Sequence, residues 1–250
     1  MRKPTWNTPS NNINLSQDQV HIWRAWLTQP MPLIQQIAEL LSDDEKARAR
    51  RFHFERDRLK FIVGRGILRQ ILSRYLAVQA EEIQFSYGSQ GKPALAIPAT
   101  QNIQFNLAHS RNLALYAVTC KQKAGIDVEY IRRLDDMAQM AARFFSPREN
   151  AAFQRLPEKD KPAGFFNCWT RKEAWLKACG DGLTRPLDQF DVTLTPGDPA
   201  RILSIRNAPA EAARWQLQAF QPAPNYVAAL AVEDAALQTD YWHFSSLLPA

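Results

Sequence analysis

The chain has 250 residues, a hydrophobic share of 46% and a formal net charge of +6, which is enough material for one large or two small domains with a real core. No apolar run approaches the roughly 18 residues of a membrane span, and no apolar stretch follows the N-terminal Met-Arg-Lys. We therefore expect no signal peptide and no membrane anchor. The three cysteines show no metal-binding spacing, so we expect reduced thiols in a cytoplasmic protein.

The first half of the chain predicts a strand, then helices, then strands. Residues 1–16 are rich in Pro, Asn and Ser and are expected to be disordered. Alternating apolar residues predict a strand over 20–27, and Ser42 with Glu45 forms a capping box that opens a basic helix. The remaining elements of this half are a helix and three strands, expected near 56–76, 83–87, 103–107 and 113–119.

The second half repeats this order. Its elements are three helices, over about 135–144, from Ser146 and across 165–178, and then three strands over 187–194, 215–220 and 226–232. Helices followed by antiparallel strands, twice, predict an α+β protein made of two similar lobes related by an internal pseudo-twofold. We therefore divide the chain into a disordered tail 1–16, an N-terminal lobe 17–123 and a C-terminal lobe 124–250.

The helix predicted over 165–178 carries charges among its apolar residues. Glu173 and Lys177 stand four residues apart and therefore share a face. A charge held near a core is costly unless it is paired or binds a ligand. A solvated surface ion pair explains these two residues equally well, so their meaning depends on the rest of the chain.

A second acidic pattern, G-I-D-V-E over 125–129, alternates apolar and acidic residues. On a strand, Asp127 and Glu129 project to the same face, where two carboxylates raise each other's pKa unless a cation lies between them. One interpretation is an exposed strand with solvated acids. The other is a hard-cation site for magnesium, with Glu173 as the third oxygen ligand.

These two patterns together resemble the signature of the 4′-phosphopantetheinyl transferases, G-[IV]-D-x-E followed after forty-odd residues by W-[ST]-x-K-E-[AS]-x-x-K. The second half of that signature is met by W-T-R-K-E-A-W-L-K from Trp169. G-K-P at 91–93 and N-L-A-H-S at 106–110 occur in the family's order as well. The resemblance covers roughly residues 16–235 and is to the two-lobed Sfp-type (surfactin-synthetase-activating) class.

The resemblance implies the family's fold of two lobes and its magnesium-dependent reaction. Members of the family move phosphopantetheine from coenzyme A to a serine of an apo acyl or peptidyl carrier protein, and adenosine 3′,5′-bisphosphate leaves. It also implies a monomer whose partner is the acidic helix surface of a carrier protein from fatty-acid, polyketide or non-ribosomal peptide synthesis. Neither nucleic acid nor a membrane is expected as a partner.

Matched position by position, the resemblance assigns the metal ligands and the catalytic groups. Asp127, Glu129 and Glu173 match the ligands of Mg²⁺, for which Mn²⁺ is an alternative. Glu173 is also the candidate general base, and Lys177 matches the lysine that binds the diphosphate of coenzyme A. His109 matches a histidine that contacts a phosphate of coenzyme A, although a lone histidine near a strand is usually structural.

Further coenzyme A contacts are expected at the N-terminal lobe. Lys92 and Arg48 match residues of the adenosine 3′-phosphate region, and Ala108 stands where the family usually has Ser, which leaves its backbone N–H to donate. Lys172 is expected to contact phosphate. Glu45 occupies the place of a family lysine, which weakens this part of the match. Arg65 could contact the ligand or equally brace the interface between the lobes.

Two other functions remain open at this stage. The basic run Lys46–Arg51 suits a nucleic-acid-binding or scaffold protein without catalysis, but three converging carboxylates would repel a phosphate backbone. The other is a catalytically inactive homologue. The presence of Asp127, Glu129, Glu173 and Lys177 argues against it.

Overall fold

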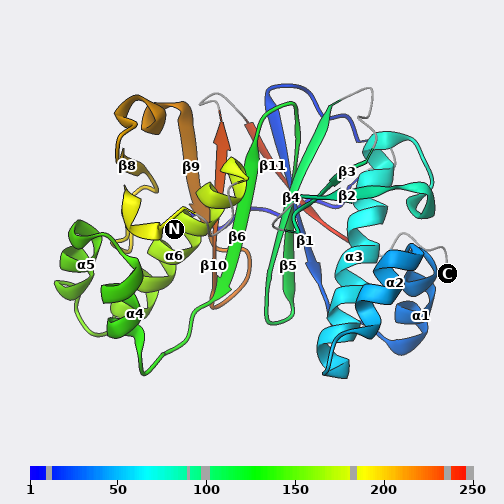
Figure 1. Ribbon diagram of the computed structural model, residues 1–250, viewed down its shortest axis with the longest axis horizontal. Helices are drawn as coiled ribbons and strands as arrows, with labels where there is room; N and C mark the ends of the chain where they lie inside the picture. The colour runs from blue at the N-terminus through cyan, green and yellow to red at the C-terminus, as the bar shows by residue number, and fades with distance from the viewer. Residues whose placement is uncertain (10–12, 89–90, 97–101, 181–184, 234–237, 246–250) are drawn as a thin grey trace.

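The computed structural model describes residues 1–9, 13–88, 91–96, 102–180, 185–233 and 238–245. The elements stack in four layers, with helices on the two outer faces and two sheets facing each other in the middle (Figure 1). This arrangement is the expected α+β architecture of two lobes, each built of helices packed on one face of an antiparallel sheet.

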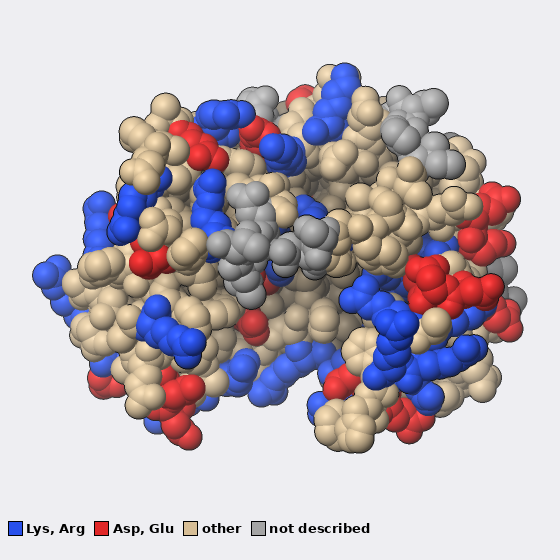
Figure 2. All heavy atoms as spheres, in the orientation of Figure 1, with Lys and Arg blue, Asp and Glu red and all other residues tan. Residues whose placement is uncertain are grey.

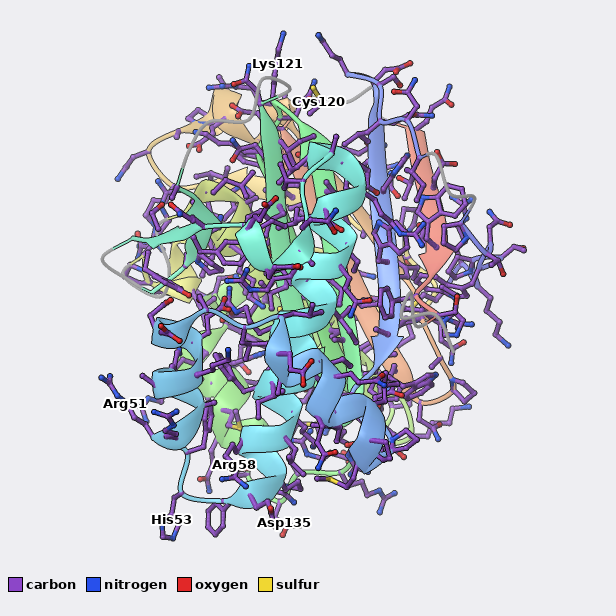
Figure 3. The ribbon with its side chains drawn as sticks, turned by 90° about the vertical axis from the view of Figure 1, so that its right-hand side faces the viewer. Arg51, His53, Arg58, Cys120, Lys121 and Asp135 are labelled. Carbon is purple, nitrogen blue, oxygen red and sulfur yellow. The ribbon has the colours of Figure 1, made fainter. Side chains whose placement is uncertain are left out.

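The N-terminal lobe begins with a strand, continues with helices and ends with strands. Its elements are β1 (Gln19–Trp26), α1 (Met31–Glu39), α2 (Asp43–Arg50), α3 (Glu55–Leu76), a 3₁₀ turn (Ala80–Glu82), β2 (Phe85–Tyr87), β3 (Pro93–Leu95), β4 (Ile103–Ser110) and β5 (Leu113–Cys120). Helix α3 runs along the sheet with α2 beside it, and Cys120 and Lys121 lie at the opposite end of the molecule from Arg51 and Arg58 (Figure 3).

The C-terminal lobe follows the same order. Its elements are β6 (Ala124–Tyr130), α4 (Met137–Phe144), α5 (Pro147–Gln154), α6 (Lys161–Cys179), a 3₁₀ turn (Leu187–Gln189), β7 (Phe190–Val192), β8 (Ile202–Ile205), a second 3₁₀ turn (Pro209–Arg214), β9 (Trp215–Phe220), β10 (Tyr226–Glu233) and β11 (Gln238–His243). Residues 187–189 form a 3₁₀ turn rather than the start of the strand predicted over 187–194.

The two sheets repeat one topology. In each lobe the first strand pairs antiparallel with the last, and the last pairs antiparallel with the one before it, giving β1-β5-β4 and β6-β10-β9. Strand β11 departs from this plan, since it leaves the C-terminal lobe and pairs in parallel with β1. The predicted boundary at 124–250 is therefore wrong for the last strand, which completes the N-terminal sheet.

The same buried ion pair occurs once in each lobe. In α2 the capping-box residue Glu45 is fully buried and accepts from Arg69 Nε at 2.7 Å, while Arg69 Nη1 also donates to the carbonyls of Ala80 and Ile83 at 2.9 and 2.8 Å. A charge this deep is tolerated only when it is paired and hydrogen-bonded.

In the C-terminal lobe, Glu149 of the α5 capping box pairs with Lys172 Nζ at 2.8 Å, and Nζ donates to the carbonyls of Leu187 and Phe190 at 2.7 and 2.5 Å. The cation of the long helix thus joins the preceding cap to the following 3₁₀ turn in both lobes. This equivalence supports the predicted pseudo-twofold at the level of single side chains.

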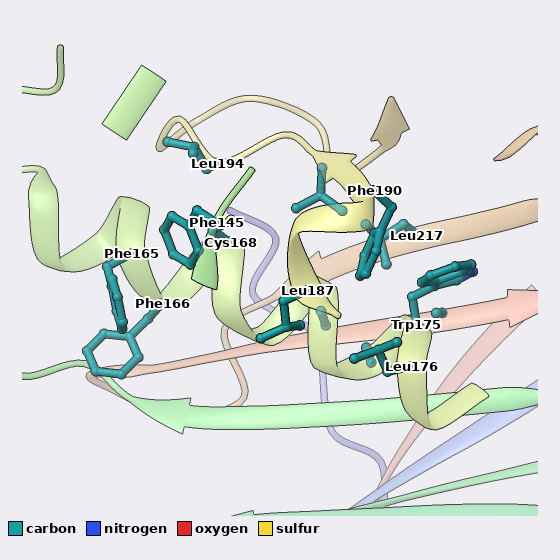
Figure 4. Packing of buried hydrophobic residues seen from close by; sticks show 14 of the residues in the cluster. Phe145, Phe165, Phe166, Cys168, Trp175, Leu176, Leu187, Phe190, Leu194 and Leu217 are labelled. Carbon is teal, nitrogen blue, oxygen red and sulfur yellow. The ribbon is translucent and has the colours of Figure 1, made fainter. Parts of the chain in front are cut away.

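Three apolar cores hold the layers together. One lies between the N-terminal helices and their sheet and one between the C-terminal helices and theirs, where Trp175 packs 4.3 Å from Phe190 between ring centroids (Figure 4). The third fills the space between the two sheets and contains Ile22, Ile126 and Leu230, none of which is exposed. The sheets therefore form one sandwich, and the lobes are not independent bodies.

The described part of the N-terminal tail is ordered by pairing, contrary to the predicted disorder. The carbonyl of Arg2 accepts from the N–H of Gln221 at 2.9 Å beside β9, and Asn7 exchanges two backbone hydrogen bonds with β11, at 2.9 and 2.8 Å. Because β9 and β11 are edge strands of the two sheets, residues 1–9 cover both edges on one side of the sandwich. Residues 10–12 of the predicted tail lie outside the described residues.

Candidate functional site

Strand β6 lies against α6 within the C-terminal lobe and beside β4 of the N-terminal lobe, and Gly125 makes the close approach of β6 to α6 possible. A Cβ added at Gly125 would lie 2.1 Å from the carbonyl oxygen of Ala174 and 2.3 Å from the backbone nitrogen of Ala178. Only glycine fits between this strand and this helix. Asp127, two residues farther along the same face, is thereby brought to the helix, and Lys177 Nζ lies 2.6 Å from its Oδ1.

Asp127 is a buried carboxylate whose surroundings disfavour its charged form. It is 6% exposed, and its Oδ2 is buried without a hydrogen-bond partner. Burial raises the pKa of Asp127 to about 7, although Lys177 opposes the shift, and Glu173 and Glu129 raise it further. Burial likewise raises the pKa of Glu173, against the effect of Lys177 and with that of Glu129. The three carboxylates therefore act on one another electrostatically, as the sequence predicts.

The N-terminal lobe holds the other side of this acidic group in place. Ser110, the last residue of β4, donates its hydroxyl to Glu129 Oε2 at 2.7 Å and accepts from the N–H of Tyr130 at 3.1 Å. Farther up the strand, Asn106 Oδ1 accepts from the N–H of Ile126 at 2.9 Å. These bonds join β4 to β6, so the carboxylates of one lobe are positioned by side chains of the other.

His109 lies on β4 itself, which extends farther than the strand predicted over 103–107. The ring is exposed on the cleft side and borders a pocket of about 260 Å³ together with Lys60, Phe61 and Arg65. The protein atoms packed around the ring lower the pKa of His109, and Lys177 and Lys60 lower it further, while Glu129 opposes them. A neutral imidazole can both accept and donate a hydrogen bond.

Arg48 lies farther out on the N-terminal lobe. It is exposed on α2 and lines a hollow of about 740 Å³ with Arg51, Tyr87 and Gly91. Lys and Arg side chains gather over α2, and the surface is hollowed between the two lobes (Figure 2). This hollow and the pocket beside His109 both border Phe52, so the two lie next to each other on the N-terminal lobe.

Lys92 is turned toward the other lobe. Its Nζ donates to the backbone carbonyl of Lys177 at 2.6 Å, and the side chain is half-buried. Burial lowers the pKa of Lys92, and the nearby Lys177 and Lys123 lower it further, while Cys179 opposes them. This lysine therefore links the N-terminal lobe to the backbone of α6.

The side chains of Lys172 and Ala108 both lie away from the cleft, which corrects the expected side-chain contact of Lys172 and leaves the backbone N–H of Ala108 as the group expected to donate. The side chain of Lys172 is fully buried in its ion pair with Glu149 and does not reach the cleft, because it lies on the opposite face of α6 from Glu173 and Lys177. The side chain of Ala108 lies in the core between the two sheets and is 5% exposed. A side chain at this position therefore faces the sandwich and not a ligand.

The acidic group is not assembled into a metal site as it stands. Across the described ranges, no three His, Cys, Asp or Glu side chains form a group that could hold a metal ion. The chemistry of the donors nevertheless fits a hard cation: three carboxylates repel one another, and the orphaned Oδ2 of Asp127 lacks the partner that a buried oxygen needs.

Sequence reasoning found the carboxylates, Lys177 and His109, but missed what holds them. The positioning roles of Asn106 and Ser110 were overlooked, although both lie in the N-L-A-H-S motif next to His109. Lys60 borders the pocket with His109. Its sequence context does not predict this position, because a single lysine on a predicted helix belongs to no motif. Arg65 pairs with Glu45 at 3.3 Å, so it braces its own lobe and not the interface.

Comparisons with known proteins match both halves of the chain to the same family. A profile of the 4′-phosphopantetheinyl transferase superfamily matches residues 123–231, and a profile for the N-terminal part of 4′-phosphopantetheinyl transferase matches residues 23–121. The chain is similar to 4′-phosphopantetheinyl transferase HetI of Nostoc sp., with 44% identity over 245 residues that cover 98% of this chain and 100% of that protein. It is also similar to 4′-phosphopantetheinyl transferase psf-1 of Bacillus pumilus, with 32% identity over 76% of this chain and 80% of that protein, and to Sfp of Bacillus subtilis, with 30% identity over 62% and 66%.

Proposed function

The chain belongs to the 4′-phosphopantetheinyl transferase superfamily, and on that premise we propose that it transfers the 4′-phosphopantetheine group of coenzyme A to a serine of an apo acyl or peptidyl carrier protein. The products are the holo carrier protein and adenosine 3′,5′-bisphosphate. The observation that carries the proposal is the convergence of Asp127, Glu129, Glu173, Lys177 and His109 on the cleft between the lobes.

The reaction forms one phosphorus–oxygen bond and breaks another. The serine hydroxyl oxygen attacks the β-phosphorus of coenzyme A, and the bond between that phosphorus and the bridging diphosphate oxygen breaks. Glu173 is the proposed base for the serine proton, because its raised pKa brings it nearer to the working pH of a general base. Lys177 and His109 lie where they would hold the diphosphate oxygens as charge develops on the leaving group.

We propose Asp127, Glu129 and Glu173 as the residues that hold a magnesium ion, with manganese as an alternative. When bound, the ion would draw negative charge from the diphosphate and so stabilise the leaving group. Ser110 and Asn106 keep Glu129 and the backbone of β6 in register for this task. The buried, unpartnered oxygen of Asp127 supports the assignment.

The far end of coenzyme A is assigned to the N-terminal lobe. Arg48 and Arg51 line a hollow that adjoins the pocket beside His109 at Phe52, and an anionic 3′-phosphate suits these guanidinium groups. We therefore propose Arg48 as a contact for the 3′-phosphate, whereas Lys92 donates to the backbone of α6.

The carrier protein is proposed to approach the same cleft with an acidic helix surface. Arg132 and Arg133 come shortly after β6, and Arg132 Nη1 lies 3.9 Å from Glu129 Oε2, so we propose that these arginines meet such a helix. We propose that the enzyme acts as a monomer in the cytoplasm. No disulfide joins the three cysteines, all of which lie in described segments, and no helix within those segments is long and apolar enough to cross a membrane.

The test is incubation with coenzyme A, magnesium and a panel of apo carrier proteins, followed by intact mass measurement. We expect one carrier to gain the mass of a single phosphopantetheine. The gain should vanish with a chelator and return with magnesium or manganese. Absence of transfer to every carrier would contradict the function, and full transfer in excess chelator would remove the metal role of Asp127.

A further inference from the structure

Lys92 crosses the cleft to the last turn of α6. It lies in the turn before β3 of the N-terminal lobe, and its ammonium group donates to the carbonyl of Lys177 at 2.6 Å. The last four carbonyls of a helix have no partner within the helix, and the C-terminal end carries partial negative charge. A lysine from another lobe therefore satisfies one of these acceptors and complements the charge of the helix end.

The peptide that Lys92 holds is fixed on a second side as well. A Cβ at Gly125 would lie 2.9 Å from the carbonyl carbon of Lys177, so β6 presses directly against this peptide. The side chain of the same residue carries the ammonium group that lies 2.6 Å from Asp127 Oδ1. The backbone of Lys177 is thus clamped between Gly125 and Lys92, while its side chain reaches into the acidic group.

The position of Lys92 is maintained against repulsion. It is half-buried, and both Lys177 and Lys123 act against its charge. A charge-assisted hydrogen bond to a helix C-terminus is the compensating interaction that the structure offers. A lysine whose only task were to bind an exposed phosphate would not need this bond to the site helix.

We propose that Lys92 is a positioning residue for Lys177: it holds the last turn of α6 against β6, and so fixes where the ammonium group of Lys177 acts, instead of binding the 3′-phosphate of coenzyme A. The activity readouts of this inference rest on the proposed transferase function. Its structural readout does not.

The first experiment separates positioning from phosphate binding. Lys92→Met should lower kcat on the order of 10- to 100-fold, because a small displacement of a catalytic group has this size of effect. The ratio of KM for dephospho-coenzyme A to KM for coenzyme A should stay at the parent's value. Lys92→Arg, whose guanidinium can still reach the carbonyl, should recover most of kcat.

A matched control is Lys159→Met. Lys159 is an exposed lysine in the turn before α6, whose first residue, Lys161, lies about 24 Å along the helix from Lys177. It should behave as the parent. If Lys92→Met instead keeps kcat and loses the discrimination between the two cofactors, Lys92 is a 3′-phosphate ligand and the proposal is wrong. A Lys92→Met enzyme that matches the parent in every constant overturns it too.

A double-mutant cycle tests the route through Lys177. Lys177→Ala keeps the carbonyl that Lys92 contacts but removes the ammonium group. If Lys92 acts through that group, Lys92→Met should change kcat less than twofold in the Lys177→Ala background. An equal fall in both backgrounds would show that Lys92 acts by another route.

Amide hydrogen exchange gives a readout that needs no activity. Lys92→Met should speed exchange in the last turn of α6, around Leu176–Gly180, and leave the first turns at the parent's rate. Lys159→Met should change neither. If the parent transfers nothing but this local change is seen, the transferase function fails and the clamp stands; unchanged exchange would refute the clamp.

Discussion

Glu173 and Lys177 share one face of α6 but lie in different surroundings, so substituting each should have a different effect on rate and on metal affinity. Glu173→Gln keeps the volume and removes the charge that we propose holds the metal and takes up the serine proton. We expect the rate to fall by about 10²–10⁴-fold, with weaker magnesium binding. Lys177→Ala should lower kcat while metal affinity is largely kept, and the fold should remain, because 29% of this side chain is exposed.

The measurement is a thermal melt beside a magnesium titration for each of the two variants. The parent provides the reference for both. If the two variants lose melting temperature together and show no separate effect on metal affinity or rate, the pair is a structural salt bridge, and the active-site interpretation of α6 is lost with it.

Gly125 gives a sharper test of the site's geometry. In Gly125→Ala the new methyl would meet backbone atoms of α6 at 2.1 and 2.3 Å, and backbone cannot move aside as a flexible side chain can. We expect a loss of about 1–3 kcal/mol in the free energy of unfolding and a fall in kcat on the order of 100-fold. The control is Gly88→Ala, whose nearest neighbour would lie at 4.0 Å. A Gly125→Ala enzyme as active as the parent would contradict the close approach.

At this scale, sequence patterns located the chemistry but not every direction in which a side chain points. Strand alternation placed Asp127 and Glu129 on one face, and the resemblance to the family's motif added Glu173 as the third ligand. The resemblance assigned Lys172 to a ligand because the residue sits inside the motif. The structure shows that Lys172 repeats the role of Arg69 in the other lobe, a relation that only the two folded lobes reveal.

Among the elements, β1 and β11 are joined by a buried histidine. Trp23 Nε1 donates to the hydroxyl oxygen of Tyr75 at 2.8 Å, so the hydroxyl proton of Tyr75 is left for His21 Nδ1 at 2.9 Å. His21 Nε2 then carries the ring proton and faces Asp240 of β11 at 3.6 Å. Burial lowers the pKa of His21 to about 4, although Asp240 opposes the shift.

A pH dependence of stability follows from this histidine. The unfolded chain takes up a proton near pH 6.5 and the folded chain only near pH 4, so the stabilising effect is complete above about 6.5 and is lost as the pH falls to about 4. The loss is about 3 kcal/mol at most. Urea unfolding from pH 7 to 4 should show a shallower decline in His21→Gln, while the exposed control His53→Gln keeps the parent's slope. Equal slopes in all three would refute the role of His21.

Local patterns predicted most elements but missed α1, β3, β8 and β11. Helix α1 has only nine residues and begins with Pro at its first turn, so its helical signal is short. Strand β8 has four residues and pairs only with β7. Strand β11 was missed for a different reason, since its partner β1 lies at the other end of the chain and no local pattern records a long-range parallel pairing.

At the scale of the whole molecule, the two sheets are closed along both sides. On one side β4 and β6 are joined by Asn106 and Ser110, next to the site. On the other side, residues 1–9 bridge β9 and β11. The ring of Trp6 packs on that of Tyr241 with 5.4 Å between ring centroids, and the guanidinium of Arg24 lies over the ring of Trp6 at 4.6 Å from its centroid. The angle between the lobes is set at both sides.

Deleting residues 1–9 should therefore lower the melting temperature and uncover two edge strands, which favours association between chains. Trp6→Ala should show a smaller change in the same direction. Phe54→Ala, which removes an aromatic ring that is 62% exposed, is the control and should melt as the parent does. Melts combined with light scattering give both quantities, and a deletion variant that melts and scatters like the parent would show that the segment contributes nothing.

The return of β11 to the N-terminal sheet has a consequence for synthesis on the ribosome. Strand β1 ends at Trp26, yet its parallel partner begins at Gln238, so more than 200 residues must be translated before that edge is covered. At about 5–20 residues per second this takes on the order of ten seconds or more. Throughout that interval the nascent chain presents an open strand edge beside a growing hydrophobic surface. Chaperone binding to ribosome-bound chains should therefore persist until β11 has left the exit tunnel, long after every other strand of its sheet has been made.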